Sequence, residues 1–316
     1  MSSTQYTQSR QSHVSQKDVF ADITREIISA IEEGKAEYRM PWNASAFSSS
    51  PVNACTGKTY RGINILSLWG ATLKAGWSSH RFATYRQWSE YGCQVRKGER
   101  STKVVFWDTY TNSELEDEDR PLSFVAKSYS VFNADQVDGY DPEPVSLLDD
   151  QARIADAEAF FLNLRSDIKY IGNVACYSPS LDTVKMPSIQ YFERALDYYS
   201  VLSHEHIHWS GHKTRLNRDM SGRFGEESYA MEELVAEMGA AFLCAQLGVN
   251  TSPRTDHAGY IESWLKVLRK DTKAILTAAS TAQRAVDYLV ETANAEPRLV
   301  GKALGEAIHE VFGLKG

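Results

Sequence analysis

Apolar residues recur at intervals of three and four along several stretches of the chain, which is the spacing that places side chains on one face of an α-helix. Segment 17–35 shows this most clearly, because Phe20, Ile23, Ile27 and Ile31 form one apolar stripe between polar residues. The same spacing predicts further helices at 61–74, 84–91, 150–163, 191–210, 228–243, 260–270 and 273–293.

Runs of β-branched and aromatic residues predict strands between some of these helices. The longer runs are 103–109 and 122–132, and two shorter ones, 174–178 and 183–186, precede the helix at 191–210. Helices and strands follow one another without a regular alternation or an internal repeat. We therefore predict an α+β fold.

A segment rich in glycine, proline and acidic residues interrupts this pattern at 138–147, and such a composition is typical of a linker. We predict an N-terminal α+β domain at 17–137 and a mainly helical C-terminal domain with a small sheet at 148–316. Residues 1–16 are polar, and we expect them to form a disordered tail.

Two histidines stand four residues apart in the predicted helix at 191–210, in the segment 204–208, which reads HEHIH. Residues four apart share a helix face, so His204 and His208 can bind one metal ion. Glu205 follows the first of them, where its carboxylate can take a proton from a metal-bound water. The pattern is typical of zinc hydrolases, and it indicates Glu205 as the catalytic base. Zinc is the expected metal, and such ligands also accept manganese.

A catalytic zinc takes three protein ligands, so the third must come from another element. The predicted helix at 228–243 carries several carboxylates. We expect Glu233 to be the third ligand, with Glu232 and Glu237 as alternatives. With Glu233 on the metal, Glu237 lies one turn further along the same face, where it can accept a hydrogen bond from a ligand histidine.

Two other histidines lie close by in the sequence. His206 is about 200° around the helix from His204 and should face away from the metal. His212 continues the stripe of His204 and His208, which makes it a rival third ligand. Because it follows Gly211, a plausible helix end, we expect His212 to cap the helix or to form hydrogen bonds there.

The formal net charge of −7 argues against general nucleic-acid binding, but the charge is unevenly distributed. Segment 58–107 holds nine Lys and Arg residues and two acidic residues, a local charge of +7, with aromatic residues interleaved. Cations can follow a phosphate backbone while aromatic faces stack on unpaired bases. We predict a single-stranded DNA-binding surface made by Lys58, Tyr60, Arg61, Asn64, Arg81, Trp88, Arg96, Lys97, Arg100 and Lys103. The alternative is a small domain whose aromatic residues fill its core and whose cations are solvated.

Other features exclude whole classes of protein. The first fifteen residues lack the apolar stretch of a secretory signal, and no apolar run approaches the roughly 18 residues of a membrane span. The four cysteines are scattered without C-x-x-C pairing, which favours free thiols. We expect a cytoplasmic monomer with no membrane partner.

The chain resembles the ArdC-type antirestriction proteins of conjugative plasmids over about residues 17–290. In the first half the resemblance rests on Trp42, PVN at 51–53, GKTYRGIN at 57–64 and VFNADQ at 131–136. In the second half it rests on Tyr177, MP at 186–187, HEHIHWSGH at 204–212, RL at 215–216 and YAMEELVAE at 229–237.

This resemblance implies an N-terminal single-stranded DNA-binding domain, shared with a plasmid primase, and a C-terminal zincin-like metallopeptidase domain. It implies zinc on His204, His208 and a glutamate of 232–237, with Glu205 as the base. It also implies a role in protecting incoming plasmid DNA from host restriction.

From the metal helix we expect zinc to lower the pKa of its bound water to roughly 7, so that Glu205 can take the proton and return it to the leaving amine. Tyr177 and His257 are candidates to stabilise the oxyanion, and a strand beside the helix can hold an extended peptide. The substrate would be a DNA-bound protein or a host restriction complex. Two alternatives stay open: a DNA-coating shield with a structural or vestigial metal site, and a protein whose aromatic surface binds the restriction complex.

Overall fold

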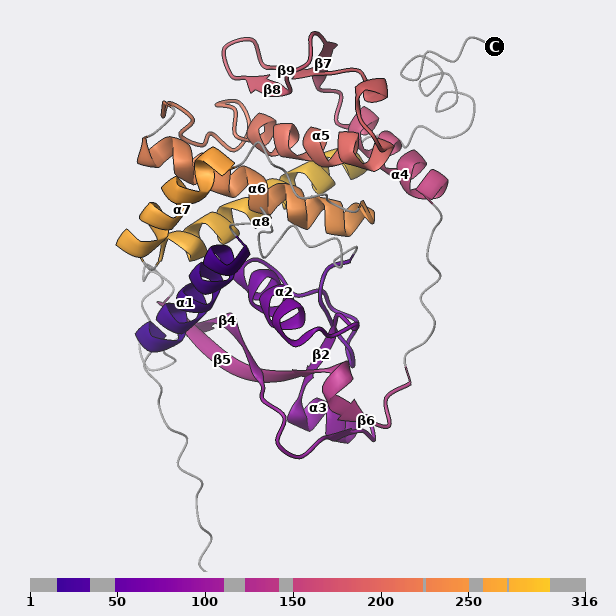
Figure 1. Ribbon diagram of the computed structural model, residues 1–316, viewed down its shortest axis with the longest axis vertical. Helices are drawn as coiled ribbons and strands as arrows, with labels where there is room; N and C mark the ends of the chain where they lie inside the picture. Colours follow the sequence, from indigo (N-terminus) through magenta and orange to yellow (C-terminus); the bar gives the residue numbers. More distant parts are fainter. Residues whose placement is uncertain are drawn as a thin grey trace, which may run out of the picture.

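The structure, a computed structural model, describes residues 16–34, 49–110, 123–141, 150–223, 226–249, 258–271 and 273–295. Figure 1 shows two regions: a sheet with short helices at one end, and long helices with a second, smaller sheet at the other. This arrangement confirms the predicted α+β fold. Of the predicted tail at 1–16 only Gln16 is described, and of the predicted linker at 138–147 only residues 138–141 are.

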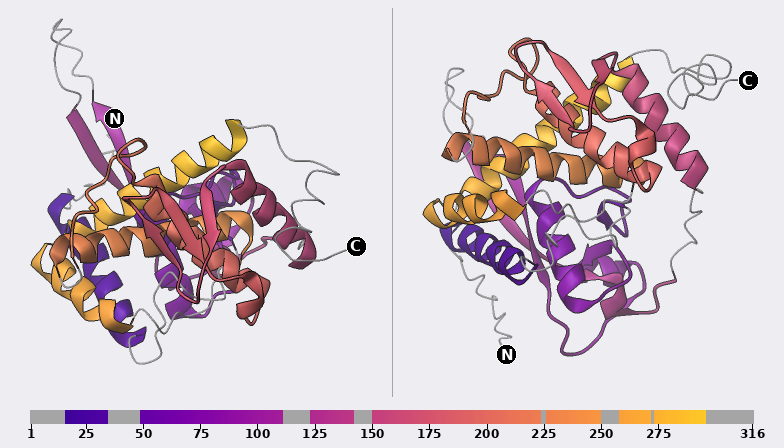
Figure 2. Two further views of the ribbon diagram at one scale, coloured as in Figure 1. Left: turned by 90° about the horizontal axis from the view of Figure 1, so that it is seen from above. Right: turned by 45° about the horizontal axis from the view of Figure 1, so that its top comes forward.

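The N-terminal region is built on a four-stranded sheet with the order β1-β2-β5-β4. These strands are β1 (Val52–Asn53), β2 (Arg81–Thr84), β4 (Thr102–Tyr110) and β5 (Ser123–Asn133). β4 and β5 pair antiparallel from Thr102 opposite Val131 to Tyr110 opposite Ser123. They form a long two-stranded ribbon, which projects at the upper left of the left-hand view in Figure 2.

Helix α2 (Ile63–Ala75) lies along the free edge of β4. The Asn64 side chain donates to the carbonyl of Val105 and accepts from its amide, both at 2.8 Å, and the Ser67 hydroxyl donates to the carbonyl of Lys103 at 2.9 Å. An edge strand leaves backbone groups without strand partners. The polar face of α2 therefore satisfies groups that the sheet itself does not pair.

The end of this region farthest from the long helices holds α3 (Tyr85–Glu90) and a two-stranded sheet of β3 (Gln94–Val95) and β6 (Val137–Asp138) (Figure 1). Thr84 and Gln87 form a capping box at the start of α3, which fixes its first turn. Trp88 is fully buried against this small sheet and donates from Nε1 to the carbonyl of Phe132 at 3.0 Å.

The C-terminal region places a three-stranded sheet over a layer of long helices (Figure 1). Strand β9 (Thr183–Met186) is central, with β7 (Asp167–Tyr170) parallel on one side and β8 (Cys176–Ser178) antiparallel on the other. The helices are α4 (Asp150–Asn163), α5 (Ala195–Ser210), α6 (Glu227–Leu247), α7 (Ala258–Lys270) and α8 (Ala274–Ala295). A short 3-10 turn at Ile189–Tyr191 precedes α5, and another in the N-terminal region, Ala134–Gln136, joins β5 to β6.

One hydrophobic core extends through both regions. Helix α1 (Gln16–Gly34) buries Ile23 and Ile27 in the same cluster that contains Trp69 of α2 and Phe242 of α6. The rings of Trp69 and Phe242 lie 6.0 Å apart. The N-terminal region and the helical layer are therefore packed together, and α1 contacts α7 as well as α2.

The predicted helices and the two long strands are present with small changes at their ends. The strands that the sequence pattern did not predict are β1, β2, β3, β6 and β7, each two to four residues long. Among the described residues, none of the helices has both the length and the apolar character of a membrane span.

Candidate metal centre

Helices α5 and α6 approach each other closely because a glycine lies between them. A Cβ atom at Gly239 of α6 would lie 2.8 Å from Cδ1 of Ile207 on α5, which is shorter than a van der Waals contact. Ile207 is itself completely buried. The close approach brings the carboxylates of α6 to the histidines of α5.

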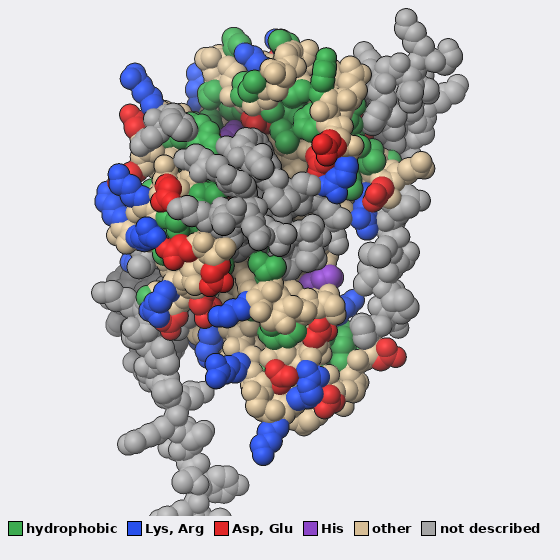
Figure 3. Space-filling view, viewed as in Figure 1, with side chains coloured by type: hydrophobic (Ala, Val, Ile, Leu, Met, Phe, Trp, Pro, Cys, Tyr) green, Lys and Arg blue, Asp and Glu red, His purple; other side chains and the backbone are tan. Residues whose placement is uncertain are grey.

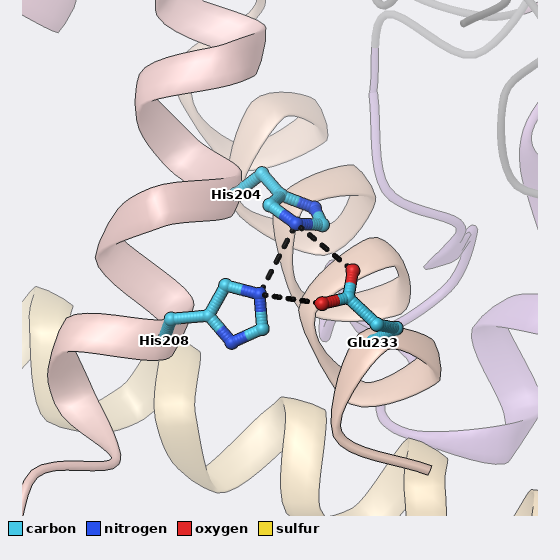
Figure 4. Close-up of side chains that lie close together, drawn as sticks. All are labelled: His204, His208 and Glu233. Atoms are coloured by element: carbon cyan, nitrogen blue, oxygen red, sulfur yellow. Dashed lines mark hydrogen bonds and ion pairs between the residues drawn. The ribbon is translucent and has the colours of Figure 1, made fainter. Parts of the chain in front are cut away.

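His204 and His208 lie one turn apart on α5, and Glu233 of α6 points toward both of them (Figure 4). The two Nε2 atoms are 3.2 Å apart. Oε2 of Glu233 lies 3.6 Å from Nε2 of His204, and Oε1 lies 3.7 Å from Nε2 of His208. These three residues are the expected ligand set, and the structure brings them together.

The other ring nitrogen of each histidine faces a different carboxylate of α6. Nδ1 of His204 lies 2.8 Å from Oε1 of Glu237, and Nδ1 of His208 lies 3.1 Å from Oε1 of Glu232. An ionised carboxylate can only accept a hydrogen bond, so Nδ1 of His208 carries the proton and its neutral ring has the lone pair on Nε2. The negative charge of Glu237 beside Nδ1 of His204 favours the same tautomer there.

Two lone pairs and the carboxylate of Glu233 therefore converge on one point in a buried environment. Like partial charges held this close repel one another unless a cation lies between them. Two imidazole nitrogens and one carboxylate oxygen are a donor set that suits Zn²⁺ and also Mn²⁺. The residues present fit a divalent transition metal.

Glu233 is an anion in this environment. Burial by itself would raise its pKa, but in the acidic range, where the histidines are protonated, a hydrogen bond from His204 and the positive charges of both histidines, with a hydrogen bond from Tyr229, hold the pKa at about 2. Burial, with hydrogen bonds to Tyr260 and Glu233, raises the pKa of Tyr229. The Tyr229 hydroxyl therefore keeps its proton at neutral pH and donates a hydrogen bond to Glu233.

The loop after α5 reaches the site through Arg218. Its Nε and Nη2 atoms donate to Oε2 and Oε1 of Glu232 at 3.0 and 2.8 Å. The same guanidinium donates to the carbonyl of Ile207 at 2.5 Å and to the hydroxyl of Ser210 at 2.9 Å. Burial would raise the pKa of Glu232, but His208 and Arg218 together lower it. Arg218 thus fixes the carboxylate that orients His208.

Glu205, the expected base, is 5% exposed and follows His204 on α5. Helix α5 contacts β8, and the negative charge of Glu205 raises the pKa of Cys176 in β8, second to burial. Within the part of the chain that the structure describes, β8 is an edge strand of the three-stranded sheet, paired with β9 on one side. A buried carboxylate, a metal-type ligand set and an edge strand are therefore neighbours.

The remaining candidates of this region have other partners. His206 is completely buried and lies 2.8 Å from the Ser166 hydroxyl and from the Leu202 carbonyl, and burial lowers its pKa to about 4. Nδ1 of His212 lies 2.8 Å from the Thr214 hydroxyl, and His212 is not part of the metal group.

Of the two residues predicted to stabilise the oxyanion, Tyr177 is among the described residues. The Tyr177 hydroxyl donates to Asp182 at 2.8 Å and accepts from Arg215 at 3.2 Å. Arg215 in turn pairs with Asp182 and lies over the ring of Trp209 at 3.9 Å. Tyr177 is therefore held by a neighbouring ion pair, and His257 lies outside the described residues.

Comparison with known proteins gives independent information on both regions. Residues 17–132 match the family described as the N-terminal domain of anti-restriction factor ArdC, and residues 155–281 match a zincin-like metallopeptidase family. A crystal structure of the antirestriction ArdC protein from plasmid R388, in its metal-free form, is 38% identical, with a TM-score of 0.73 over 89% of this chain and 100% of that one. The chain belongs to the ArdC family.

Other relatives of this ArdC family member differ in length and in state. The Mn(II)-bound structure of the same R388 protein has a TM-score of 0.70 over 87% of this chain and 98% of that one. An uncharacterized protein, y4eC, of Sinorhizobium fredii is 46% identical over 86% of this chain and 91% of its own. A DNA primase, TraC, of Escherichia coli is 32% identical over 89% of this chain, which spans only 20% of the primase.

The residues predicted to contact DNA in this ArdC family member fall into two groups. Tyr60, Asn64 and Trp88 are buried, at 4%, 5% and 0% exposure, and their polar atoms bond within the fold. The others are the cations of the N-terminal region, six exposed and Arg81 half-buried: Lys58, Arg61, Arg81, Arg96, Lys97, Arg100 and Lys103. Figure 3 shows Lys and Arg side chains over this region in one view, with acidic side chains among them.

Several exposed cations already have partners in the fold. Arg61 pairs with Asp287 of α8 at 2.5 Å and so ties the N-terminal region to the helical layer. Lys103 donates to the Ser130 hydroxyl at 2.7 Å. These two cations have structural contacts in addition to any contact with DNA.

Sequence reasoning did not identify Arg218 or Tyr229 as part of the site. Arg218 lies ten residues after His208 in an irregular loop, where no periodicity relates it to the metal ligands. Tyr229 lies one turn before Glu233 on α6, and helical spacing alone could have indicated that the two side chains are neighbours.

Proposed function

We propose that this ArdC family member is an antirestriction protein that binds single-stranded DNA through its N-terminal region and hydrolyses peptide bonds at a zinc centre in its C-terminal region. The convergence of His204, His208 and Glu233 beside Glu205 is the observation that supports hydrolysis. Family membership and the exposed cations of the N-terminal region support DNA binding. The protein would protect incoming plasmid DNA by cleaving a DNA-bound protein or a component of the restriction complex.

In this mechanism His204, His208 and Glu233 would hold Zn²⁺ or Mn²⁺, and the relative from R388 has a structure with Mn(II) bound. When bound, the ion supplies Lewis acidity that activates a water and polarises the scissile carbonyl. Glu205 takes a proton from the attacking water and returns it to the leaving amine. The low exposure of Glu205 keeps bulk water away from this proton transfer.

Other side chains position these groups. Glu237 and Glu232 accept the Nδ1 protons of the two histidines and so keep both Nε2 atoms directed at the metal position. The edge strand β8 offers backbone groups to which an extended peptide can bind as an added strand. The contact of β8 with α5, the helix that carries Glu205, supports a peptide rather than a small ester as the substrate.

The replacement Glu205→Gln tests hydrolysis, because the amide keeps the shape of the side chain but cannot accept the proton. Zinc content after loading and cleavage of casein, an unstructured protein, would be measured with and without single-stranded DNA. We expect normal zinc content and loss of cleavage by at least about 100-fold. Glu193→Gln, an exposed glutamate just before α5, is the matched control and should cleave normally. Cleavage by zinc-loaded Glu205→Gln at the wild-type rate would contradict the mechanism.

A DNA-coating shield with a structural metal site is the second candidate. It is supported by the separation of α3 and β6, at the lower end of the molecule in Figure 1, from α5, which lies beside the small sheet toward the upper end. Protection of transferred DNA in a restricting recipient distinguishes the two functions. A shield should keep protection in Glu205→Gln and lose it when Lys97 and Arg100 are both changed to Glu, whereas a peptidase should lose protection in Glu205→Gln.

A further inference from the structure

The N-terminal region contains a hollow of about 460 Å³ between α3, β3 and the end of β5. Tyr85 and Phe132 supply its aromatic side, and Gln94, Arg96 and Lys97 supply polar groups. It lies at the end of the molecule opposite the metal centre (Figure 1), since α3 and β6 are farthest from the long helices. Its occupant is therefore independent of the peptidase site.

The aromatic side of the hollow is rigid and accessible. Tyr85 is 53% exposed, and its ring lies 6.4 Å from that of Phe132 at an interplanar angle of 72°. The capping box of Thr84 and Gln87 fixes the first turn of α3, which carries Tyr85. Gln87 is also bonded to Asn53 at 3.2 Å. An exposed ring on a fixed backbone loses little conformational entropy when a flat ligand stacks on it.

The polar side of the hollow offers a defined acceptor. Nε2 of Gln94 donates to the Tyr85 hydroxyl at 3.1 Å and to the Val95 carbonyl at 2.9 Å. Both amide protons are used in the wall, so the carbonyl oxygen is the part of the Gln94 amide that a ligand can reach as an acceptor. The Tyr85 hydroxyl accepts from Gln94 and keeps its own proton for donation.

The charges around the hollow balance. Arg96 pairs with Glu99 at 3.1 Å and with Asp138 at 3.5 Å, and it also donates to the Asp135 carbonyl. With Lys97, the lining residues hold two positive and two negative side chains. A neutral lining does not select a phosphate or a carboxylate. It suits a flat, uncharged ligand with hydrogen-bonding edges, while exposed Lys97 lies where an attached phosphate could be neutralised.

We propose that this hollow binds one unpaired nucleobase of single-stranded DNA, with the base stacked on Tyr85 and an exocyclic amino group donating to the carbonyl oxygen of Gln94. The proposal rests on the DNA-binding part of the proposed function and gives that surface a defined base site. Cytosine carries such an amino group and thymine does not, so the site favours cytosine over thymine. Affinity at this position comes from the base, in addition to the phosphate contacts of the cations around it.

The test compares full-length wild type with Tyr85→Ala, which removes an exposed side chain. Binding is measured by fluorescence anisotropy to oligo(dC), to oligo(dT) and to an abasic deoxyribose-phosphate strand of equal length. Stacking on one aromatic ring contributes an effect of about 5- to 150-fold on affinity. We expect Tyr85→Ala to weaken binding to oligo(dC) by about tenfold and to leave binding to the abasic strand unchanged. Tyr191→Ala, which removes a 72% exposed ring near α5, should bind all three strands as wild type does.

A second variant tests the hydrogen bond separately. Gln94→Ala should weaken binding to oligo(dC) more than binding to oligo(dT), because only cytosine loses a partner. Equal affinity of Tyr85→Ala and wild type for oligo(dC), or an equal loss on the abasic strand, would overturn the base site while leaving DNA binding in place. Wild type that binds none of the three strands would instead overturn the DNA-binding function itself.

Discussion

Arg218 and Glu232 form a buried pair in which two nitrogens of the guanidinium donate to the two oxygens of the carboxylate. Glu232 then accepts the Nδ1 proton of His208, and Arg218 also donates to the carbonyl of Ile207. The loop after α5, α5 itself and α6 are therefore joined at the ring of His208, a candidate metal ligand. This arrangement needs a planar side chain that donates two parallel hydrogen bonds, as a guanidinium does.

Replacing Arg218 with Lys should weaken metal binding. A lysine keeps the charge but cannot donate to both oxygens of Glu232, so the carboxylate and the His208 ring become less well oriented. Loss of such a supporting contact typically lowers metal affinity by about 10- to 100-fold. Competition with a chromophoric zinc chelator measures the affinity, and circular dichroism checks the fold. Arg194→Lys, in the exposed pair with Asp197, is the control, and an equal effect of both changes would argue against a specific role for Arg218.

Replacing Gly239 with Ala should destabilise the protein, because the new Cβ would lie 2.8 Å from Ile207 at the α5–α6 contact. Overpacking of this kind costs about 1–3 kcal/mol of unfolding free energy. Urea denaturation measures the change, and Ile207→Val in the same chain should restore part of it. Gly70→Ala in α2 is the opposite case, because nothing lies within 4 Å of its Cβ position. That change should stabilise the protein by about 0.5–1 kcal/mol.

Stability should depend on pH through Glu158. Its side chain is 5% exposed and accepts a hydrogen bond from Tyr199 at 2.6 Å, and burial raises its pKa above the usual 4.5. The folded protein therefore holds this proton more tightly than the unfolded chain does. The contribution of Glu158 to stability is complete below pH 4.5 and is lost as pH rises through the folded-state pKa.

Glu158→Gln keeps the acceptor for Tyr199 and removes the charge. We expect the urea midpoint of this variant to exceed that of wild type at pH 8 and to approach it near pH 4. A variant that is less stable than wild type at pH 8 would contradict the effect of burial on this carboxyl group. Glu193→Gln, at an exposed position, should leave the midpoint unchanged at both pH values.

Asn64 and Lys97 should separate support of the fold from contact with DNA. Asn64→Ala leaves the buried amide and carbonyl of Val105 without partners, which should reduce stability by about 1–3 kcal/mol. At a temperature where it is folded, this variant should bind single-stranded DNA as wild type does. Lys97→Ala, at an exposed position, should leave stability unchanged and weaken DNA binding, most strongly at low salt. A loss of DNA affinity in folded Asn64→Ala would show that Asn64 contributes to the DNA surface.

The helices could be predicted closely because their signal is local. The segment predicted at 150–163 is α4 (Asp150–Asn163), and the segment predicted at 17–35 is α1 (Gln16–Gly34). Strands of two residues carry no usable period. β3 and β6 exist because residues far apart in the sequence, such as Val95 and Val137, are brought side by side by the rest of the fold.

The burial of the predicted DNA contacts could not be read from the sequence for the same reason. Tyr60 and Trp88 lie in a basic, aromatic segment that suggested a stacking surface. Their rings fill the cores on the two sides of the sheet. Tyr85, which is not among the predicted DNA contacts, is 53% exposed. Composition specifies how many aromatic residues a segment has, but tertiary packing decides which of them solvent can reach.

The sequence by itself determined that His204 and His208 share one face of a helix with Glu205 beside them, because helix geometry depends only on spacing along the chain. Only the tertiary structure decided which carboxylate of α6 faces Nε2 of both histidines. Glu232 and Glu233 differ by about 100° around their helix, so the choice depends on how α6 is rotated against α5. That rotation is set by the contact of Gly239 with Ile207 and by the hydrogen bonds from Arg218 to Glu232. Neither contact can be predicted from spacing along the chain.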